Sequence, residues 1–334
     1  MSAYLAVAGV LITAGCGSTN DASGDGSDRP TVVVTTNILG DVVRQSVGDL
    51  IDLEVIMPLG SDPHDFAPSA RQAEAMEQAD LLVVNGAGFE EGMTDIILNA
   101  EDSGTPVFTA ADHVSLLTLD DDHDEEDAGH ADEEPEEQAD ADHDDDGSDH
   151  GSGVDPHLWT DPDRVGDVVA AFGSVLGEIE TIDGEQLTAS VDAYVDDLAD
   201  LATAMETTLA DVAPEQRVLV TNHEVFGYFA DRFDFEVVGT VIPSLSTGAE
   251  PSAAALERLA VLIETEGVRA VFAETTSSSR LAEVLAGEVD GALAGDVAVI
   301  ELFSESLGDP GSGAETYVDM MSTNAALIAD ALGG

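Results

Sequence analysis

The sequence predicts an α/β protein with two lobes, each built on a parallel sheet, and a long helix between them. Strand and helix segments alternate in both halves of the chain, which favours parallel pairing through right-handed crossovers. Between the two series, residues 188–210 keep an uninterrupted helical pattern of apolar positions. The length of 334 residues is sufficient for two domains of ordinary size.

The first series begins with a short β-branched segment that is typical of a buried strand. Strands are expected at 31–36, 53–56, 81–85 and 106–108, and helices at 39–47, 70–78 and 90–99. Ser69 is a suitable N-cap for the second of these helices. In parallel sheets ligands bind beyond the carboxyl ends of the strands. His64 follows the second strand and therefore lies in the right kind of place.

The second series follows a helix at 163–178 and the long helix. At 1.5 Å per residue, the 23 residues of 188–210 would span roughly 34 Å, long enough to run the length of a domain. Further strands are expected at 217–221, 235–239, 270–273 and 297–300, and helices at 251–266 and 312–331. His223 follows directly after the first of these strands.

The net charge of the chain is strongly negative. It has 70 acidic residues and nine basic residues, all of which are Arg. Residues 120–150 hold 18 of the acids and no Arg, so the rest of the chain still carries 52 acids against nine Arg. Such a surface repels itself at ordinary salt and is screened at molar salt, where the Debye length is about 3 Å. We expect a cell that lives in high salt, and this charge disfavours nucleic acid as a partner.

The N-terminal segment reads as a lipoprotein signal peptide over residues 1–16. An apolar run ends in small residues before Cys16, the single cysteine, which resembles a lipobox whose cysteine is lipidated. The run is shorter than the roughly 20 residues of a transmembrane helix. The alternative is a buried N-terminal helix with an incidental cysteine. Residues 17–30 read as a flexible tether.

An acidic, His-rich stretch interrupts the first half at residues 119–151. Its composition predicts disorder. Four of the eight histidines fall in it, namely His123, His130, His143 and His150. We interpret the stretch as a weak, multi-site metal collector, with a solvated acidic loop as the alternative.

Three other histidines lie in loops beside predicted strands or helices. His64 stands in Ser61-Asp62-Pro63-His64, His157 in Asp155-Pro156-His157, and His223 in Asn222-His223-Glu224. Neutral imidazole is a common ligand for zinc. We expect the three loops to converge on one metal ion that the protein captures rather than uses for chemistry.

These motifs, with Phe303-Ser304-Glu305-Ser306 near the C-terminus, resemble those of the zinc/manganese-binding solute-binding lipoproteins of metal ABC importers, the cluster A-I family. The acidic insert resembles that of the zinc-uptake branch. The resemblance covers residues 31–332. It implies two Rossmann-like lobes joined by a rigid helix, with the metal in the cleft between them.

The resemblance implies four ligands, three of them the histidines His64, His157 and His223. The fourth falls on Glu305, and Glu274, at a strand's carboxyl end, is an alternative ligand. Asp155 and Asp161 are expected to be structural or to accept an imidazole N–H. The aromatic residues of the motifs are expected to pack, namely Trp159, Phe226 and Tyr228.

These expectations divide the chain into a signal peptide, a tether, an N-terminal lobe, a linker helix and a C-terminal lobe. The corresponding ranges are 1–16, 17–30, 31–187, 188–211 and 212–334. The protein would sit on the outer face of the cytoplasmic membrane through its lipid anchor. Its expected partners are an importer permease and its ATPase, and we expect a monomer.

Three imidazoles and one carboxylate suit Zn²⁺ better than Mn²⁺, which prefers oxygen ligands. Capture of manganese or iron by the same architecture remains an alternative. A second alternative is a zinc hydrolase. In that case Glu305 would not bind the metal, one coordination position would stay open for water, and Glu274 would act as the base. A third is an adhesion or metal-buffering protein, which would lose most of its bound metal when residues 120–150 are deleted.

Overall fold

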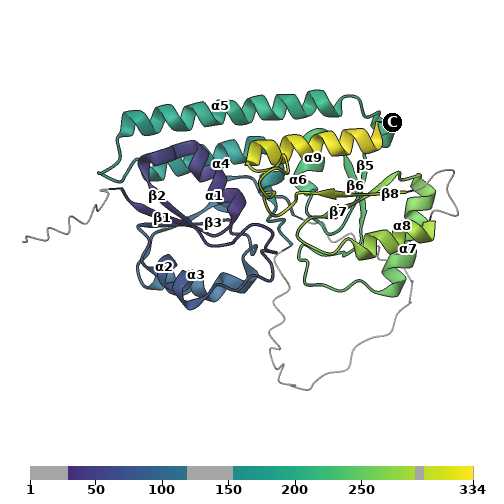
Figure 1. Cartoon of the computed structure of the whole chain (residues 1–334), viewed down its shortest axis with the longest axis horizontal. Coiled ribbons are helices and arrows are strands. Elements are labelled where there is room, and N and C mark those ends of the chain that lie inside the picture. The colour runs from purple at the N-terminus through teal and green to yellow at the C-terminus, as the bar shows by residue number, and fades with distance from the viewer. Residues whose placement is uncertain (1–28, 119–152, 290–296, 334) are drawn as a thin grey trace, which may run out of the picture.

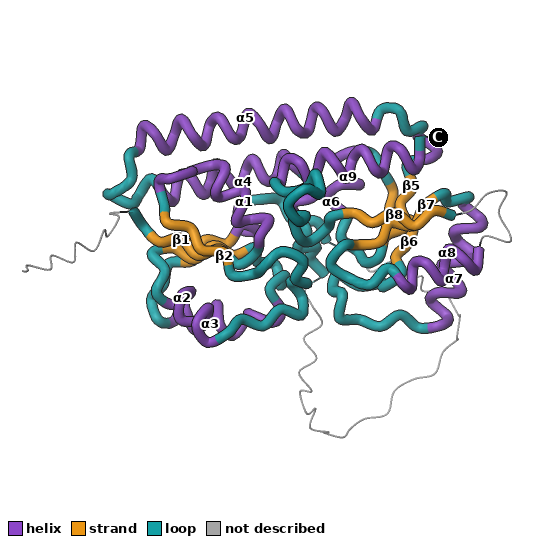
Figure 2. The backbone as a smooth tube through the Cα atoms, viewed as in Figure 1, coloured by secondary structure: helices purple, strands orange, loops and turns teal. Residues whose placement is uncertain are grey.

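The computed structural model describes residues 29–118, 153–289 and 297–333. In these ranges the chain forms two four-stranded sheets, both parallel throughout (Figures 1 and 2). The strand orders are β2-β1-β3-β4 and β6-β5-β7-β8. In both sheets the chain first moves to one side of its starting strand and then to the other. The crevice at such a reversal, beyond the carboxyl ends of the strands, is where α/β proteins bind ligands.

The first lobe comprises the first sheet and the helices around it. Its strands are β1 (Thr31–Val34), β2 (Asp52–Val55), β3 (Leu81–Val84) and β4 (Val107–Thr109). Its helices are α1 (Asn37–Val47), α2 (Ala70–Glu77), α3 (Thr94–Asp102) and α4 (Pro162–Leu176). The predicted strands and helices of this half are all present, with ends that move by a few residues.

The second lobe comprises the second sheet and its helices. Its strands are β5 (Val218–Thr221), β6 (Glu236–Thr240), β7 (Ala270–Glu274) and β8 (Ala298–Leu302). Its helices are α6 (Gly227–Phe233), α7 (Ala253–Glu266), α8 (Arg280–Val289) and α9 (Tyr317–Leu332). The helix α5 (Gly184–Leu209) runs along both lobes and packs on α4 and α9 (Figure 1).

Alternating residues of the strands face different cores. In β1, Val32 and Val34 point to the side of α1 and α4, whereas Val33 points to the side of α2 and α3. All three are fully buried, as expected for a parallel strand covered on both faces. The β-branched run that predicted the strand is therefore explained by burial on both faces.

The described residues bury three hydrophobic cores. The central core continues from one lobe to the other beneath α5 and includes Val34, Phe108, Phe172, Leu198, Phe272 and Ile328. The first outer core lies under α2 and α3 and includes Val33, Met76, Leu82, Met93 and Ala100. The second outer core lies under α7 and α8 and includes Val220, Leu259, Ile263, Val271 and Leu285.

Three helix starts differ from the prediction by four or five residues. Helix α3 begins at Thr94 rather than 90, because a 3₁₀ turn occupies Glu91–Met93. The long helix begins at Gly184, four residues before 188, because the side chain of Asp183 accepts from the backbone N–H groups of Glu185 and Gln186 and caps it. The last helix begins at Tyr317 rather than 312. Gly311 and Gly313 have φ of 93° and 80°, which is not helical backbone.

The short helices α6 and α8 were not predicted. Among the described residues, no helix is both long and apolar enough to span a membrane. The predicted signal peptide with Cys16, the tether up to residue 28 and the whole His-rich stretch at 119–151 lie outside the described residues.

Candidate metal centre

Four side chains from four separate loops meet between the two sheets. His64 follows β2, His157 precedes a 3₁₀ turn at Leu158–Thr160, and His223 lies two residues after β5. Glu305 lies three residues after β8. All four are buried, with exposed fractions of 6%, 0%, 0% and 2% respectively. The structure thus brings together the three predicted histidines and the predicted carboxylate.

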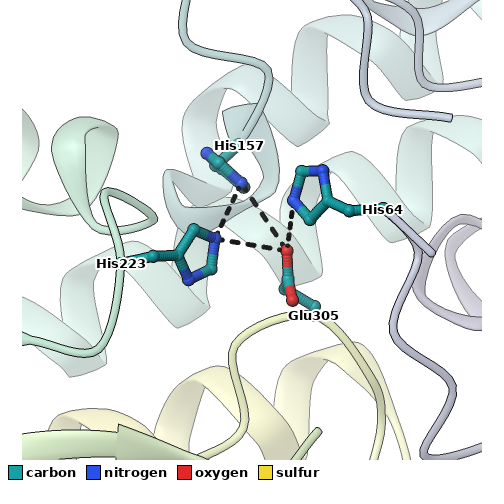
Figure 3. A group of neighbouring side chains, drawn as sticks. All are labelled: His64, His157, His223 and Glu305. Atoms are coloured by element: carbon teal, nitrogen blue, oxygen red, sulfur yellow. Dashed lines mark hydrogen bonds and ion pairs between the residues drawn. The ribbon is translucent and has the colours of Figure 1, made fainter. Parts of the chain in front are cut away.

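The four side chains point their ligand atoms toward one another (Figure 3). One ligand atom of each lies within 4.8 Å of all the others. The Nε2 atoms of His64, His223 and His157 are 2.9, 3.4 and 3.7 Å from Glu305 Oε1. The Nε2 atoms of His157 and His223 are 3.4 Å apart. Such spacings are compatible with a single ion at the centre, because zinc–nitrogen and zinc–oxygen bonds are about 2.0–2.2 Å long.

The opposite nitrogen of each imidazole contacts a carboxylate. His157 Nδ1 is 2.8 Å from Asp155 Oδ1, His223 Nδ1 is 2.5 Å from Glu274 Oε1, and His64 Nδ1 is 3.2 Å from Glu91 Oε1. In a neutral imidazole a proton on Nδ1 leaves a lone pair on Nε2. The carboxylates therefore favour the tautomer in which all three Nε2 atoms are free to bind a cation.

The repeated Asp-Pro-His sequence explains the local shape of two loops. In each, the aspartate side chain accepts from the backbone N–H of the histidine two residues later, over 3.0 Å in Asp62-Pro63-His64 and 2.9 Å in Asp155-Pro156-His157. The second aspartate also contacts the Nδ1 of its own histidine. The first does not, and Glu91 takes that position for His64.

The carboxylates of the centre stabilise the charged form of two of its histidines, and the histidines stabilise the charged form of Glu305. Burial lowers the pKa of His223, but the charge of Glu274 and its hydrogen bond, together with Glu305, outweigh burial and raise the pKa to about 10. The pKa of His157 is also raised, since contacts with Asp155 and Glu305 outweigh its burial. Burial raises the pKa of Glu305, yet the three imidazoles hold it well below its usual value. A carboxylate that stays ionised while buried is a strong cation ligand.

Glu305 offers a further atom to a cation. Its Oε2 is buried and has no hydrogen-bond partner among the described residues. Buried carboxylate oxygens are normally paired with a donor or a metal. The residues present therefore fit a divalent cation.

Three other residues that the sequence singled out lie outside the group of four side chains. Glu274, the alternative ligand, is buried behind His223 on its Nδ1 side. Asp161 caps α4 and forms an ion pair with Arg164. Phe226 packs in the central core as expected.

The residues Trp159 and Tyr228 are buried as expected but also form hydrogen bonds. Trp159 Nε1 donates to the carbonyl of Ser304, and the Tyr228 hydroxyl donates to that of Asp155. Sequence reasoning did not find Glu91. The available signal was its position shortly after strand β3, at the same sheet edge as His64.

The loop histidines His123, His130, His143 and His150 lie outside the described residues, so their metal-collecting role stays a prediction. The eighth histidine, His113, stacks on Phe108 with ring centroids 4.6 Å apart. It is not part of the centre.

Comparison with protein families gives a match over residues 32–331 to the model described as ZnuA, zinc-uptake complex component A, periplasmic. The chain belongs to the ZnuA family. Its members are substrate-binding transport proteins, and the two-lobed fold described above is theirs. The predicted family resemblance and fold class are thereby confirmed.

Proteins that are similar to this chain differ in the metal that their names give. The chain is 27% identical to the manganese-binding lipoprotein MntA of Halalkalibacterium halodurans, over 94% of this chain and 92% of that protein. It is 28% identical to the high-affinity zinc uptake system protein ZnuA of Bacillus subtilis, over 98% and 96%. The solved structure of the periplasmic zinc-binding protein TroA of Treponema pallidum superposes with a TM-score of 0.75 at 27% identity, covering 91% of this chain and 99% of that one.

Proposed function

We propose that this ZnuA-family protein captures Zn²⁺ outside the cytoplasmic membrane and delivers it to an ABC-type importer. The observation that carries the proposal is the buried group of three imidazole nitrogens and one carboxylate oxygen within 4.8 Å of one another. We assign the ligand roles to His64, His157, His223 and Glu305. Membership of a zinc-uptake family supports transport as the purpose of this binding.

The donor set favours zinc over manganese. Imidazole is the softer, zinc-compatible ligand, whereas Mn²⁺ prefers oxygen donors and higher coordination numbers. Four protein ligands also match the closed, tetrahedral sites that zinc adopts when it does no chemistry. Because the relatives include a manganese-binding lipoprotein, the test must offer both metals.

A carrier fits these residues better than a hydrolase. Catalytic zinc keeps one position open for water, and Glu305 would fill that position here. The candidate base, Glu274, is in contact with His223 Nδ1 and is 1% exposed. It is therefore poorly available for proton transfer to a substrate.

The importer and the membrane complete the proposal. We assign Cys16 as the lipidated residue, residues 17–30 as the tether and residues 119–151 as a loop that gathers metal loosely. The division into lobes at 31–187 and 212–334 with a linker helix at 188–211 is part of the same proposal. The protein would act as a monomer that docks on a permease driven by its ATPase.

Metal content of the full chain tests the binding step. After dialysis against a chelator of moderate affinity, we expect one zinc per chain that excess Mn²⁺ does not displace. His157→Ala and Glu305→Ala should lose this ion, whereas His113→Ala, which changes a histidine outside the centre, should keep it. Retention of one equally tight zinc in Glu305→Ala would refute the four-ligand site, and displacement of zinc by manganese would refute the metal assignment.

A further inference from the structure

A hydrogen bond joins two loops that carry ligands from opposite lobes. The indole Nε1–H of Trp159 donates to the backbone carbonyl of Ser304 over 2.7 Å. Both residues are buried, at 2% and 1% exposed. Trp159 lies two residues after His157, and Ser304 directly precedes Glu305. The bond therefore joins residues that lie one or two positions from two of the four proposed ligands.

The first lobe forms two more bonds to the loop of residues 304–307. Leu307 N–H donates to Asn37 Oδ1 over 2.8 Å, and Gly60 N–H donates to Ser306 Oγ over 2.8 Å. These contacts lie on the C-terminal side of Glu305, and the Trp159 contact lies on its N-terminal side. Glu305 follows a strand of the second lobe, yet groups of the first lobe hold the backbone on both of its sides.

The indole of Trp159 is itself fixed in place. Its ring packs against Phe89 and His157, with centroid distances of 4.6 and 5.3 Å. Its backbone carbonyl accepts from the hydroxyl of Tyr317 over 2.7 Å. The N–H group cannot turn away without disturbing these contacts, so it is a rigid anchor for Ser304.

We propose that Trp159 is a positioning residue for metal capture, whose indole N–H keeps the Glu305 carboxylate aimed at the three imidazoles. The proposal rests on the metal site of the proposed function. A carboxylate near the start of a strand-to-helix loop would gain hydration by turning outward, because its burial is costly without a cation. Holding the backbone on both sides removes that freedom before the metal arrives, and preordered ligands bind more tightly.

The variant Trp159→Phe tests the proposal because it removes the N–H and keeps an aromatic ring. We expect zinc affinity, measured by competition with a chromophoric chelator, to fall about 10- to 100-fold, as for other residues that support metal ligands indirectly. The matched control is Thr105→Val, which removes the partly buried hydrogen bond from Thr105 Oγ1 to the Glu77 carbonyl (2.8 Å), away from the centre. We expect this control to bind zinc like the unmodified chain.

A double-mutant cycle separates positioning from a general loss of structure. If Trp159 acts through Glu305, Trp159→Phe should cost nothing further in a Glu305→Ala background, where three imidazoles still bind zinc weakly. An equal loss of affinity in both backgrounds would overturn the proposal. So would unchanged affinity in Trp159→Phe when the unmodified chain binds one tight zinc. If the unmodified chain binds no tight zinc, the proposed function fails instead.

Spectroscopy of the unmodified chain keeps the proposal testable if Trp159→Phe does not fold. The chain has one tryptophan, so its indole N–H gives a single assigned signal in a ¹H–¹⁵N spectrum. We expect this proton to exchange slowly with solvent, to shift on zinc binding, and to exchange faster in Glu305→Ala. Fast exchange in the zinc-bound chain, or a signal that zinc does not move, would contradict the proposal.

Discussion

At the scale of single residues, the proposed centre holds more negative charge than its imidazoles can balance. Glu305 faces the Nε2 atoms, and Asp155, Glu274 and Glu91 contact the Nδ1 atoms. When the imidazoles are neutral, four carboxylates surround the place where a cation would bind. A divalent ion would offset this repulsion, so we expect the carboxylates at the Nδ1 atoms to contribute to the proposed capture as well as Glu305.

Protons compete with the metal for His223. The folded, metal-free chain has a His223 pKa raised to about 10, above the roughly 6.5 of an unfolded chain. The associated stability is fully present below about pH 6.5 and is lost as the pH rises through 10. Zinc needs the neutral ring. Its affinity should therefore increase as the pH rises toward 10.

The variant Glu274→Gln should reduce this competition. Removing the carboxylate charge lowers the pKa of His223 toward its ordinary value, so that at pH 8 zinc displaces fewer protons than in the unmodified chain. Calorimetry in two buffers of different ionisation enthalpy measures the protons released. An unchanged proton count would mean that Glu274 does not control the charge of His223.

Residues of the centre could be predicted from the sequence where they lie in a short motif, and not where their partner is distant along the chain. The three histidines and Glu305 lie in short motifs, and Asp155 lies in the same motif as its histidine. Glu91 is 27 residues from His64 along the chain. No motif connects these two residues, and the only signal was that each follows a strand of the same sheet, which does not specify a contact.

At the scale of elements, helix α4 contains two glycines with opposite expected effects. A Cβ on Gly173 would lie 2.8 Å from Cγ2 of Val191 in α5, whereas a Cβ on Gly166 would meet no atom within 4 Å. Gly173 therefore sets the close approach of α4 and α5. Gly166 contributes no such contact.

We expect Gly173→Ala to lower the free energy of unfolding by about 1–3 kcal/mol, because it overpacks the α4–α5 contact. Gly166→Ala in the same helix should raise it by about 0.5–1 kcal/mol, because alanine favours helix more than glycine does. Urea denaturation of the metal-free chain measures both. Similar effects of the two substitutions would contradict the proposed role of Gly173.

Elements were predicted well where burial dictates the pattern and poorly where caps decide the ends. The four residues of β3 are all buried, so a continuous apolar run marked the strand. The start of α5 depends on a side-chain cap by Asp183, which hydrophobic spacing does not report. Helix α6 has seven residues, too few for helical periodicity to emerge.

At the scale of the whole molecule, Arg217 and Arg232 connect the second lobe to helices outside it. Arg232 of α6 pairs with Asp163 of α4 and Glu206 of α5, both at 2.7 Å. Arg217 donates to carbonyls near the end of α5 and to that of Phe233. These cations connect the helices against a background of repulsion from the excess of carboxylates.

We expect the chain to unfold at low ionic strength and to gain stability with salt. Raising NaCl from about 0.1 M to about 1 M shortens the Debye length from about 10 Å to about 3 Å and screens the acidic surface. The thermal midpoint of the metal-free chain should rise. Sucrose, which favours compact states without screening charge, is the control. A midpoint that is insensitive to NaCl, or matches that in sucrose, would argue against charge repulsion and against adaptation to high salt.

The arrangement of one central core and two outer cores has a consequence for how the molecule opens. Amide hydrogen exchange reports such openings segment by segment, and segments over small cores open with lower free energy. The amides of α2, α3, α7 and α8 should exchange before those of α4, α5 and α9, which share the central core. His64 lies between β2 and α2, and Glu91 begins the 3₁₀ turn Glu91–Met93 that precedes α3. The helices α2 and α3 would therefore open before the central core does, next to His64, the first proposed ligand. A metal ion could then enter or leave while the two lobes stay joined.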